Sequence, residues 1–568
     1  MQIKYLVTLC CMVCSQALLA QWDGNINTVN NAITNNSYAD REALSIPDGS
    51  GGIICVWRIF DFSSNVQNIY AQRKNSNGAI SWGSATAPVL LYTSTHYLEI
   101  TDIVADGNGG AYMSWVDNLT DTTSYLVVQK INSNGIIQFA PSGIVVNTNN
   151  THRYSSGQIF ANATGFFITW ADEIANTLND IPIYAQVFAQ KYNVTGQAQW
   201  GADGVQVSNA AGLRASPLII GDGNNGVFIS FLDTRNSGLD SNGDFENIDI
   251  FAQHLSSTGS KLWAATDAIV NTEPYNQYTT YGEQSGNTMI ADSIGGFYIA
   301  FLDYRIGNDS NHHFYIQRLN SNGNRLLASS GVALTTITSK SNRELVKLLY
   351  DGLNGVVATW SEHNYNLNIG EVHAKRISNT GNLLWGPTSK IISPVSANGF
   401  GSYGVCADQQ GNYTFTWIVF KDSTSSNVIK AQKINNNAAK QWDTLGVPIC
   451  YNALSNPANI AIVKSNTSSI IIWTDDRNIT LSSADLYAAK LGTNGSLINT
   501  TSTGYVTATN GNWNNGATWI GGLVPPYGAN VKVLHSITVN TNVACSSIQV
   551  ILPGAITVFT GSVVTILR

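Results

Sequence analysis

Charged residues are scarce in this chain, and their scarcity narrows the range of partners. Only 11% of the 568 residues are charged, with 29 Lys and Arg against 36 Asp and Glu. A nucleic-acid-binding protein needs clustered Lys and Arg to displace counterions, and the sequence contains no such cluster. We therefore expect no nucleic-acid partner. Hydrophobic residues make up 43% and aromatic residues 10%, which is the composition of a folded protein.

Cysteine is also rare. Three of the seven cysteines lie within the first 20 residues, which leaves Cys55, Cys406, Cys450 and Cys545. Their spacing is not that of a zinc site. Cys406 and Cys450 would be the pair within one repeat, but four cysteines allow three full pairings and the sequence does not choose among them.

Long apolar runs are missing except at the N-terminus. Residues 1–20 have the order of a secretory signal peptide: basic Lys4, an apolar run, then small residues before a cleavage site after Ala20. Lipid attachment to Cys10, Cys11 or Cys14 is the alternative, although none follows a clear lipobox. No later stretch is long and apolar enough to cross a bilayer, so we expect no transmembrane segment. The sequence predicts a secreted or cell-surface protein.

A self-similar unit of about 60 residues is what the chain has in abundance. Each unit contains a turn such as Asp106-Gly107-Asn108-Gly109-Gly110, an apolar strand that ends in an aromatic residue, a third strand and a second turn with Asn and Gly. The first aromatic residue of each unit is Trp57, Trp115, Trp170, Phe231, Phe301, Trp360, Trp417 or Trp473. Eight such units, each with four short strands, predict an all-β fold with an eight-bladed β-propeller over residues 21–500.

The two ends of the repeat region complement each other. Most units carry a second aromatic four residues after the Gly of the later turn, as in Gly196 and Trp200, but the eighth unit has Asn499 there. The segment Gln21-Trp22-Asp23-Gly24 is similar to Gln199-Trp200-Gly201. We therefore expect an N-terminal strand near Trp22 to complete the last blade, so that the ring has no open edge.

The sequence motifs of the repeats resemble those of a known group of proteins. Phe231-Leu232-Asp233-Thr234-Arg235 followed by Phe251-Ala252-Gln253, and Phe301-Leu302-Asp303-Tyr304-Arg305 followed by Tyr315-Ile316-Gln317, resemble a propeller-like repeat of large secreted proteins from Bacteroidetes-type bacteria. The resemblance covers about residues 41–500. It implies a fold and a cell-surface setting, not an activity. The sorting domain that often ends such proteins is not recognisable here.

Residues 501–568 differ from the repeats. The segment from Gly511 to Gly522, with Trp513 and Trp519, resembles the opening of β-solenoid or other all-β modules in similar secreted proteins. We expect a short C-terminal β-rich, solenoid-like module. Its few rungs and the lack of an evident cap suggest that it is incomplete.

Acidic residues recur two positions after the first aromatic in six units. They are Asp117, Asp172, Asp233, Asp303, Glu362 and Asp475, and in three units an Arg follows at Arg235, Arg305 or Arg477. A circle of carboxylates could bind cations or sugar hydroxyls. We favour the alternative that they tie loops to their own blades by charge-assisted hydrogen bonds, because a residue needed in every blade serves the architecture.

The longest loop, between Arg235 and Ile248, is the candidate for a metal site. Asp240, Asn242, Asp244 and Glu246 place oxygen-bearing side chains at alternate positions, a pattern that could hold calcium. A solvated acidic loop is the alternative. We interpret His312-His313 as a plain surface pair, because adjacent strand residues point to opposite faces. No catalytic or cofactor-binding residue is assigned.

Three functions remain open. The first, which we favour, is a non-enzymatic secreted or cell-surface binding or adhesion protein whose partner is a glycan or a surface protein. The second is a propeller hydrolase or lyase acting on polysaccharide, which needs two carboxylates converging on a cleft. The third is a structural spacer for a C-terminal module. Catalytic residues should break the repeat, and the acids named above mostly obey it.

Overall fold

The computed structural model describes residue 22, residues 31–35 and residues 40–566, except 62–63, 148–150, 175–181, 183, 242, 265, 280–287, 306–311, 336–341, 365–368, 395–399, 409, 421–426, 451–454, 478–483, 499–504, 521–523, 526–528 and 552. Apart from a short 3-10 helix at Gly516–Thr518, all regular structure among these residues is β.

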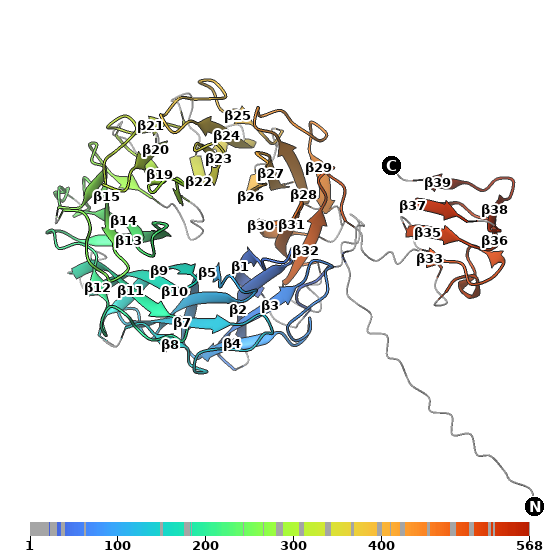
Figure 1. Cartoon of the computed structure of the whole chain (residues 1–568), viewed down its shortest axis with the longest axis horizontal. Coiled ribbons are helices and arrows are strands. Elements are labelled where there is room, and N and C mark those ends of the chain that lie inside the picture. The colour runs from blue at the N-terminus through green and yellow to red at the C-terminus, as the bar shows by residue number, and fades with distance from the viewer. Residues whose placement is uncertain are drawn as a thin grey trace, which may run out of the picture.

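Eight antiparallel sheets follow one another along the chain and form a ring (Figure 1). Blade 1 contains β1 (Asp40–Pro47), β2 (Ile53–Asp61), β3 (Val66–Lys74) and β4 (Val89–Ser94). Blade 2 contains β5 (Tyr97–Ala105), β6 (Ala111–Asn118), β7 (Ser124–Ile131) and β8 (Ile144–Val145). Blade 3 contains β9 (Arg153–Asn162), β10 (Gly165–Ile174), β11 (Tyr184–Asn193) and β12 (Val205–Gln206). Blade 4 contains β13 (Arg214–Gly221), β14 (Val227–Asp233), β15 (Asp249–Leu255) and β16 (Ala268–Asn271).

The second half of the ring repeats this plan. Blade 5 contains β17 (Gln277–Tyr278) and β18 (Met289–Ala291), which both pair with β19 (Phe297–Asp303), then β20 (His313–Leu319) and β21 (Val332–Ala333). Blade 6 contains β22 (Asn342–Tyr350), β23 (Val356–Asn364), β24 (Ile369–Ile377) and β25 (Lys390–Ile391). Blade 7 contains β26 (Phe400–Ala407), β27 (Tyr413–Val419), β28 (Val428–Ile434) and β29 (Val447–Cys450). Blade 8 contains β30 (Pro457–Ser465), β31 (Ser468–Asp475) and β32 (Asp485–Leu491). The first strand of a blade lies nearest the centre of the ring and the last at its circumference (Figure 1).

A repeated Asp shapes the turn between the first two strands of a blade. The Asp48 carboxylate accepts hydrogen bonds at 2.7 Å from the backbone N–H groups of Ser50 and Gly52. The same two contacts, to residues two and four positions later, are made by Asp106, Asp222, Asp292, Asp351 and Asp408. The side chain thus satisfies backbone donors that the tight turn leaves unpaired.

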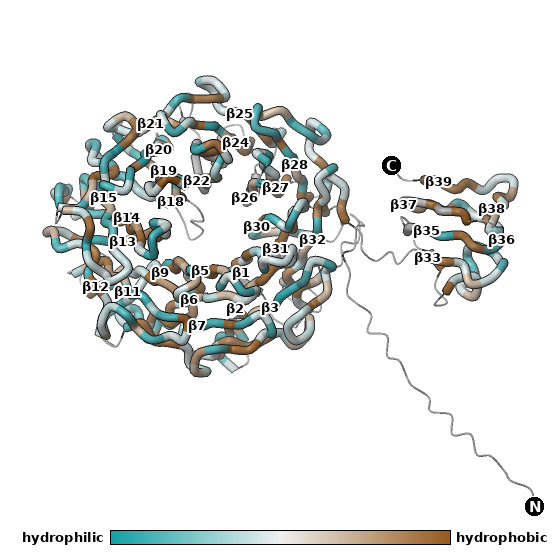
Figure 2. Tube along the Cα trace, in the orientation of Figure 1, coloured by the Kyte–Doolittle hydropathy of each residue, from teal (hydrophilic) through white to brown (hydrophobic). Residues whose placement is uncertain are grey.

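The hydrophobic core lies between neighbouring blades. One cluster joins Val56 and Trp82 of blade 1 to Trp115 of blade 2, and another joins Leu302 of blade 5 to Trp360 of blade 6. Because each sheet is covered on both faces, the second strands are buried along most of their length, and hydrophobic stretches occur in every blade (Figure 2).

The N-terminal residues contact the last blade. Ala32 forms an antiparallel bridge with Tyr487, and the Ile33 N–H donates to the Leu486 carbonyl at 2.7 Å, so residues around Ala32 take the fourth-strand position of blade 8. Trp22 has no exposed surface and packs with Trp57 of blade 1 and Leu486 of blade 8. The pairing closes the ring.

The C-terminal module has parallel strands in place of antiparallel blades. One sheet contains β33 (Tyr505–Val506), β35 (Ala529–Val533), β37 (Val543–Val550) and β39 (Val564–Ile566), and the other contains β34 (Gly511–Asn512), β36 (Ser536–Val539) and β38 (Ala555–Val558). Successive turns of the chain contribute one strand to each sheet, which is a solenoid arrangement. Trp513 and Trp519 are buried in its core.

The predicted fold class, an all-β eight-bladed propeller with a short solenoid-like segment, is confirmed. The domain boundaries, including a signal peptide at residues 1–20, stay predictions. Within the described part of the chain, no helix is long and apolar enough to cross a membrane. Cys55, Cys406, Cys450 and Cys545 are all free thiols.

Candidate functional site

The recurring acids contact the segment that enters their own blade. Asp117 accepts hydrogen bonds from the Tyr92 hydroxyl at 2.9 Å and the Ser94 hydroxyl at 3.0 Å, and lies 3.1 Å from His96 Nδ1. These three residues belong to the chain that runs from blade 1 into blade 2. Asp172 is contacted in the same way by His152, at 2.6 Å. The acids therefore anchor incoming segments.

The three repeated arginines bind the same acids. Arg235, Arg305 and Arg477 each form an ion pair with the Asp two residues earlier. Each guanidinium also lies over the aromatic ring of the third strand, at 3.8 Å from Phe251, 3.8 Å from Tyr315 and 4.1 Å from Tyr487. Such carboxylates are engaged within their blades, which matches the interpretation that they tie loops in place.

The acidic loop of blade 4 is a short hairpin. Leu239 pairs with Phe245, and the Asp240 carboxylate accepts a hydrogen bond from the Asp244 N–H at 2.9 Å. Asp244 and Glu246 are exposed, and Asn242 lies outside the described residues. Among the residues that the structure describes, no group of three or more His, Cys, Asp or Glu side chains is placed to hold a metal ion. The calcium site stays a prediction.

The interpretation of His312-His313 as a surface pair is wrong. His312 and His313 have only 7% and 3% of their surface exposed. His313 Nδ1 lies 3.2 Å from the Thr335 hydroxyl, and the His312 ring packs 5.5 Å from the Tyr304 ring. The segment before β20 packs against the blade, so both residues are covered even though they point to opposite faces.

A chain of polar contacts in blade 6 also departs from the repeat. His373 stands where most blades have an aromatic or apolar residue, stacked 5.8 Å from Trp360. Its Nδ1 lies 2.9 Å from the Ser389 hydroxyl, and its Nε2 lies 3.1 Å from Glu371. Glu362 accepts a hydrogen bond from the Trp360 indole N–H at 3.0 Å.

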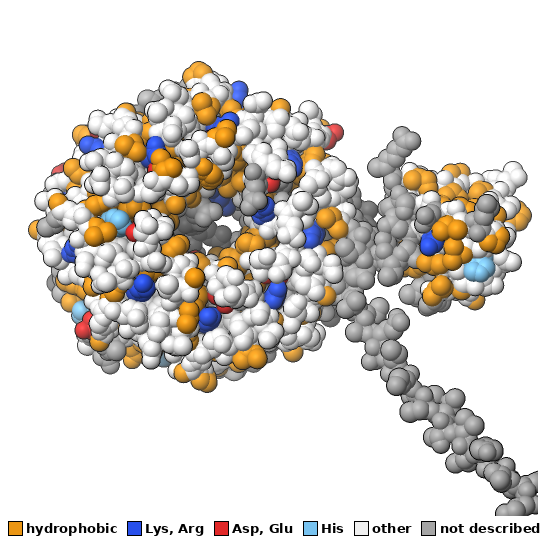
Figure 3. Space-filling model, viewed as in Figure 1, with side chains coloured by type: hydrophobic (Ala, Val, Ile, Leu, Met, Phe, Trp, Pro, Cys, Tyr) orange, Lys and Arg blue, Asp and Glu red, His pale blue; other side chains and the backbone are white. Residues whose placement is uncertain are grey.

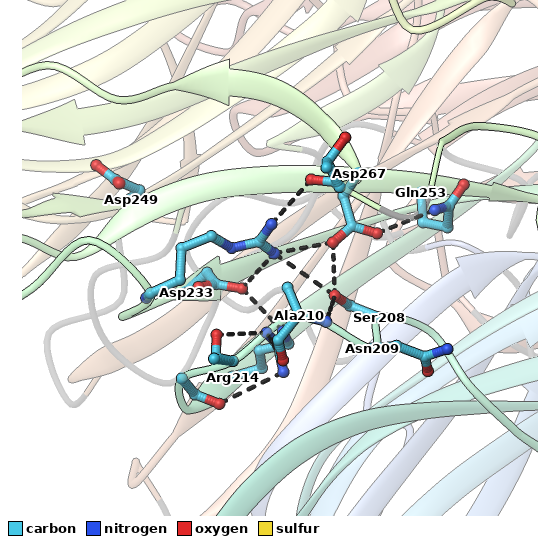
Figure 4. Close-up of polar contacts among 12 residues, drawn as sticks. Ser208, Asn209, Ala210, Arg214, Asp233, Asp249, Gln253 and Asp267 are labelled. Carbon is cyan, nitrogen blue, oxygen red and sulfur yellow. Dashed lines mark hydrogen bonds and ion pairs between the residues drawn. The ribbon is translucent and has the colours of Figure 1, made fainter.

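Blade 4 holds the densest cluster of buried charges in the described chain (Figure 4). Arg214 and Arg235 both contact Asp233, at 2.8 and 2.6 Å, and Arg235 also contacts Asp267 at 2.8 Å. Arg214 is 1% exposed, and its other donors bind the backbone carbonyls of residues 210, 211 and 212. The second arginine balances charge that would otherwise be buried without a partner.

Asp249 is the unusual member of this cluster. It is fully buried and pairs across the sheet with Asp233. Its Oδ2 accepts a hydrogen bond from Asn236 at 2.7 Å, but its Oδ1 has no hydrogen-bond partner among the described residues. Burial, together with the nearby Asp233 charge, raises the pKa of Asp249 to about 6.

Asp267 belongs to the same cluster and directly precedes β16. Its φ is +62°, and it occupies the position, four residues after the second aromatic, that Gly204 and Gly331 hold with similar φ in blades 3 and 5. The carboxylate accepts hydrogen bonds from the Ser208 hydroxyl at 2.5 Å and the Gln253 amide at 2.9 Å, besides the contact with Arg235. These contacts hold a non-glycine residue in the left-handed region.

An open groove of about 570 Å³ begins at Asp267 and runs between blades 4 and 5. Blade 4 contributes the half-buried Trp263 and the exposed Ile269, and blade 5 contributes Asn322, Asn324 and Arg325. On the face seen in Figure 3, most described side chains are uncharged and the Lys and Arg side chains lie apart from one another.

Two residues that depart from the repeat are part of the groove lining. Blade 5 has Leu327 where most other blades have an aromatic residue, and blade 4 has Asp267 where blades 2, 3, 5 and 7 have Gly. The sequence signal for Asp267 is weak, because blades 1 and 6 also lack Gly at this position and have Thr86 and Ser389. The meeting of the two positions depends on the packing of adjacent blades.

Comparisons with known proteins find structural neighbours of low sequence identity and no relatives in sequence. No protein-family model matches the chain, and no curated protein is similar in sequence. Among solved structures, the chain is similar to the polysaccharide lyase Uly1, with 8% identity over 81% of this chain and 99% of the lyase and a TM-score of 0.42. It is also similar to the alpha-L-arabinanase of Penicillium chrysogenum complexed with arabinobiose, with 9% identity over 69% and 92% and a TM-score of 0.32. The NanB sialidase of Streptococcus pneumoniae matches with 8% identity over 78% and 84% and a TM-score of 0.34. Identities this low give no information about what the chain binds.

Proposed function

We propose that this chain is a secreted or cell-surface protein whose propeller binds a polysaccharide in the groove between blades 4 and 5. The observation that carries the proposal is the lining of that groove. It combines one broad aromatic side chain, Trp263, with the amides of Asn322 and Asn324, in an opening about 570 Å³ in size. Export rests on the sequence of residues 1–20 and on the resemblance of the repeats to those of surface proteins.

The physical fit is to a sugar ring. The Trp263 indole stacks with Phe228 at 5.6 Å and packs against Gly323 of blade 5, so it is rigid, and the C–H groups of a pyranose can cover the apolar part that stays exposed. Amides both donate and accept hydrogen bonds, as hydroxyls require. The Trp263 N–H is already bound to the Ser321 carbonyl at 2.7 Å, so the indole is held in one orientation before a ligand arrives.

A second candidate is a polysaccharide-acting enzyme. The observation in its favour is Asp249, because a carboxyl group with a pKa of about 6 suits a general acid in glycoside cleavage. Asp249 has no exposed surface, however, and the charges nearest to it are paired with each other. A general acid must reach the leaving oxygen, so we prefer binding to catalysis. The calcium site at Asp240, Asn242, Asp244 and Glu246 remains part of the proposal as a loop-stabilising ion.

Substitution of the groove tryptophan tests the proposal. On an array of polysaccharides, the full chain should bind one or more members and the Trp263→Ala variant should bind about two- to tenfold more weakly, since an aromatic contact contributes roughly 0.5–1.5 kcal/mol. Trp442→Ala is the matched control: Trp442 is also half-buried, and its indole donates to the Thr493 carbonyl of the next blade at 3.2 Å.

The outcomes separate the candidates. Equal loss of binding in both variants, or none in either, would remove the groove as the site. A reducing-sugar assay on every bound polysaccharide tests the second candidate, a polysaccharide-acting enzyme. Turnover by the full chain that is lost in Asp249→Asn would replace the binding proposal by the enzymatic one.

A further inference from the structure

Arg325 lines the groove, and no ion pair among the described residues neutralises its charge. It lies in the turn between β20 and β21, and its Nη1 donates to the Ser329 carbonyl at 2.6 Å. Within the described part of the chain, no carboxylate lies at ion-pair distance from it. Eight other arginines do pair with carboxylates: Arg58, Arg73, Arg214, Arg235, Arg305, Arg318, Arg376 and Arg477.

The other charged residue of the groove lining is already neutralised. Asp267 has no exposed side-chain surface, and its carboxylate is bound by Arg235, Ser208 and Gln253. The remaining polar lining, which includes Asn322, Asn324 and Ser329, is uncharged. The charge that the groove offers to a ligand is therefore the guanidinium of Arg325, which lines the groove together with Trp263 of the neighbouring blade.

We propose that the groove selects an acidic polysaccharide and that Arg325 binds the carboxylate of a hexuronic acid residue. This inference rests on the proposed polysaccharide binding at the same groove. A guanidinium presents its donors as a planar fork that matches a carboxylate, and among the described residues only Nη1 of Arg325 has a hydrogen-bond partner. Trp263 of blade 4 and Arg325 of blade 5 line the same opening, so a sugar bound at Trp263 brings its own carboxylate or that of its neighbour into the groove that Arg325 lines.

The test compares two forms of one polymer on the full chain by isothermal titration calorimetry. Polygalacturonate and its methyl-esterified form share a backbone and differ in the charge of the carboxyl group. We expect the unchanged protein to bind the acid form at least about tenfold more tightly, and the preference to fall with added salt. Arg325→Gln should abolish the preference, whereas Arg325→Lys should keep part of it, because lysine retains charge but not the fork.

A matched control is available in blade 7. Lys440 precedes Trp442 by two positions, as Arg325 precedes Leu327, and its amine donates to the Thr444 carbonyl at 3.2 Å. Lys440→Gln removes an equivalent charge away from the groove and should leave the preference unchanged. Equal binding of both polymer forms, or a preference that survives in Arg325→Gln, would overturn the inference while leaving polysaccharide binding intact.

Two further results would contradict the assignment to a uronate or the proposed function itself. If dextran sulfate binds as tightly as polygalacturonate and loses as much affinity in Arg325→Gln, the group recognised is any anion, and the assignment to a uronate fails. If the unchanged protein binds no polysaccharide on the array either, the proposed function itself fails.

Discussion

The indole Nε1 of Trp22 donates a hydrogen bond to the backbone carbonyl of Ser76 at 2.9 Å. The same contact links Trp82 to Ser133, Trp200 to Ser257, Trp263 to Ser321, Trp385 to Asn436 and Trp442 to Thr493. In each case an indole next to the outer edge of one blade binds the later turn of the following blade. Trp22 makes this contact from blade 8 to blade 1, so the ring is joined by the same device that joins its neighbouring blades.

Replacing Trp22 should therefore open the ring. Trp22→Ala removes a fully buried indole and should lower the free energy of unfolding by about 3–5 kcal/mol. Trp22→Phe keeps most of the apolar volume and loses the hydrogen bond, which should cost about 1 kcal/mol more than the volume change. Thermal unfolding followed by circular dichroism measures both. If Trp22→Ala were no more damaging than the half-buried Trp442→Ala, closure through Trp22 would contribute nothing particular to stability.

Asp249 should make the propeller less stable above neutral pH. The pKa of its carboxyl group is about 6 in the folded protein against 3.8 in an unfolded chain, so the folded state holds the proton more tightly. Its contribution to stability is complete below pH 3.8 and is lost as the pH rises through about 6. Asp249→Asn stays uncharged and keeps an acceptor for Asn236. Relative to the unchanged protein, the variant should gain about 1–3 kcal/mol between pH 4 and pH 7.

Unfolding in denaturant at several pH values checks this expectation. Asp244→Asn is the control, since Asp244 is exposed in the same loop. A difference between Asp249→Asn and the unchanged protein that stays constant from pH 4 to pH 7 would show that Asp249 titrates as an ordinary carboxyl group.

Gly323 should be required for the close approach of blades 4 and 5. Its φ is +79°, and an added Cβ would lie 2.9 Å from the Cβ of Ala268 and 3.1 Å from the Trp263 ring. Gly323→Ala combines about 1–2 kcal/mol of backbone strain with roughly 1–3 kcal/mol of overpacking, and it should weaken polysaccharide binding at the groove.

Gly352→Ala isolates the backbone part of that cost. Gly352 has a φ of +80°, with nothing within 4 Å of an added Cβ. Its variant should lose only the strain energy and bind polysaccharide normally. Melting temperatures of the two variants that fall equally would show that Ala268 and Trp263 move aside for the new methyl group.

Much of the fold was predictable because its signals are local. The Asp of each early turn and the glycines of the later ones act within four or five residues, so they recur visibly along the chain. The period of about 60 residues counts the blades, and the buried second strands read as apolar runs. The missing aromatic at Asn499 and the spare one at Trp22 even indicated where the ring closes, although the strand pairing itself falls ten residues later, at Ala32.

The candidate site was much less predictable. The acids that stand out in the sequence, such as Asp117 and Asp475, hold segments in place, and the loop with Asp240 and Asp244 forms an ordinary hairpin turn. His373 and Ser389 meet only because β24 and β25 are adjacent in one blade. Burial likewise depends on how the segments of the folded chain pack together, which is why His312 and His313 are buried although we expected them at the surface.

The sequence by itself determined the number of blades, the turns within them and the β character of both parts, because hydrogen bonds and hydrophobic alternation within a blade depend on neighbours along the chain. Only the tertiary structure decided where a ligand could bind. The groove needs Trp263 and Asp267 of one blade beside Gly323 and Arg325 of the next, and residues about 60 positions apart face each other only when the ring has formed. Leu327 is smaller than the aromatic residues at this position in other blades, and it lines a groove only together with residues of the blade that packs beside it.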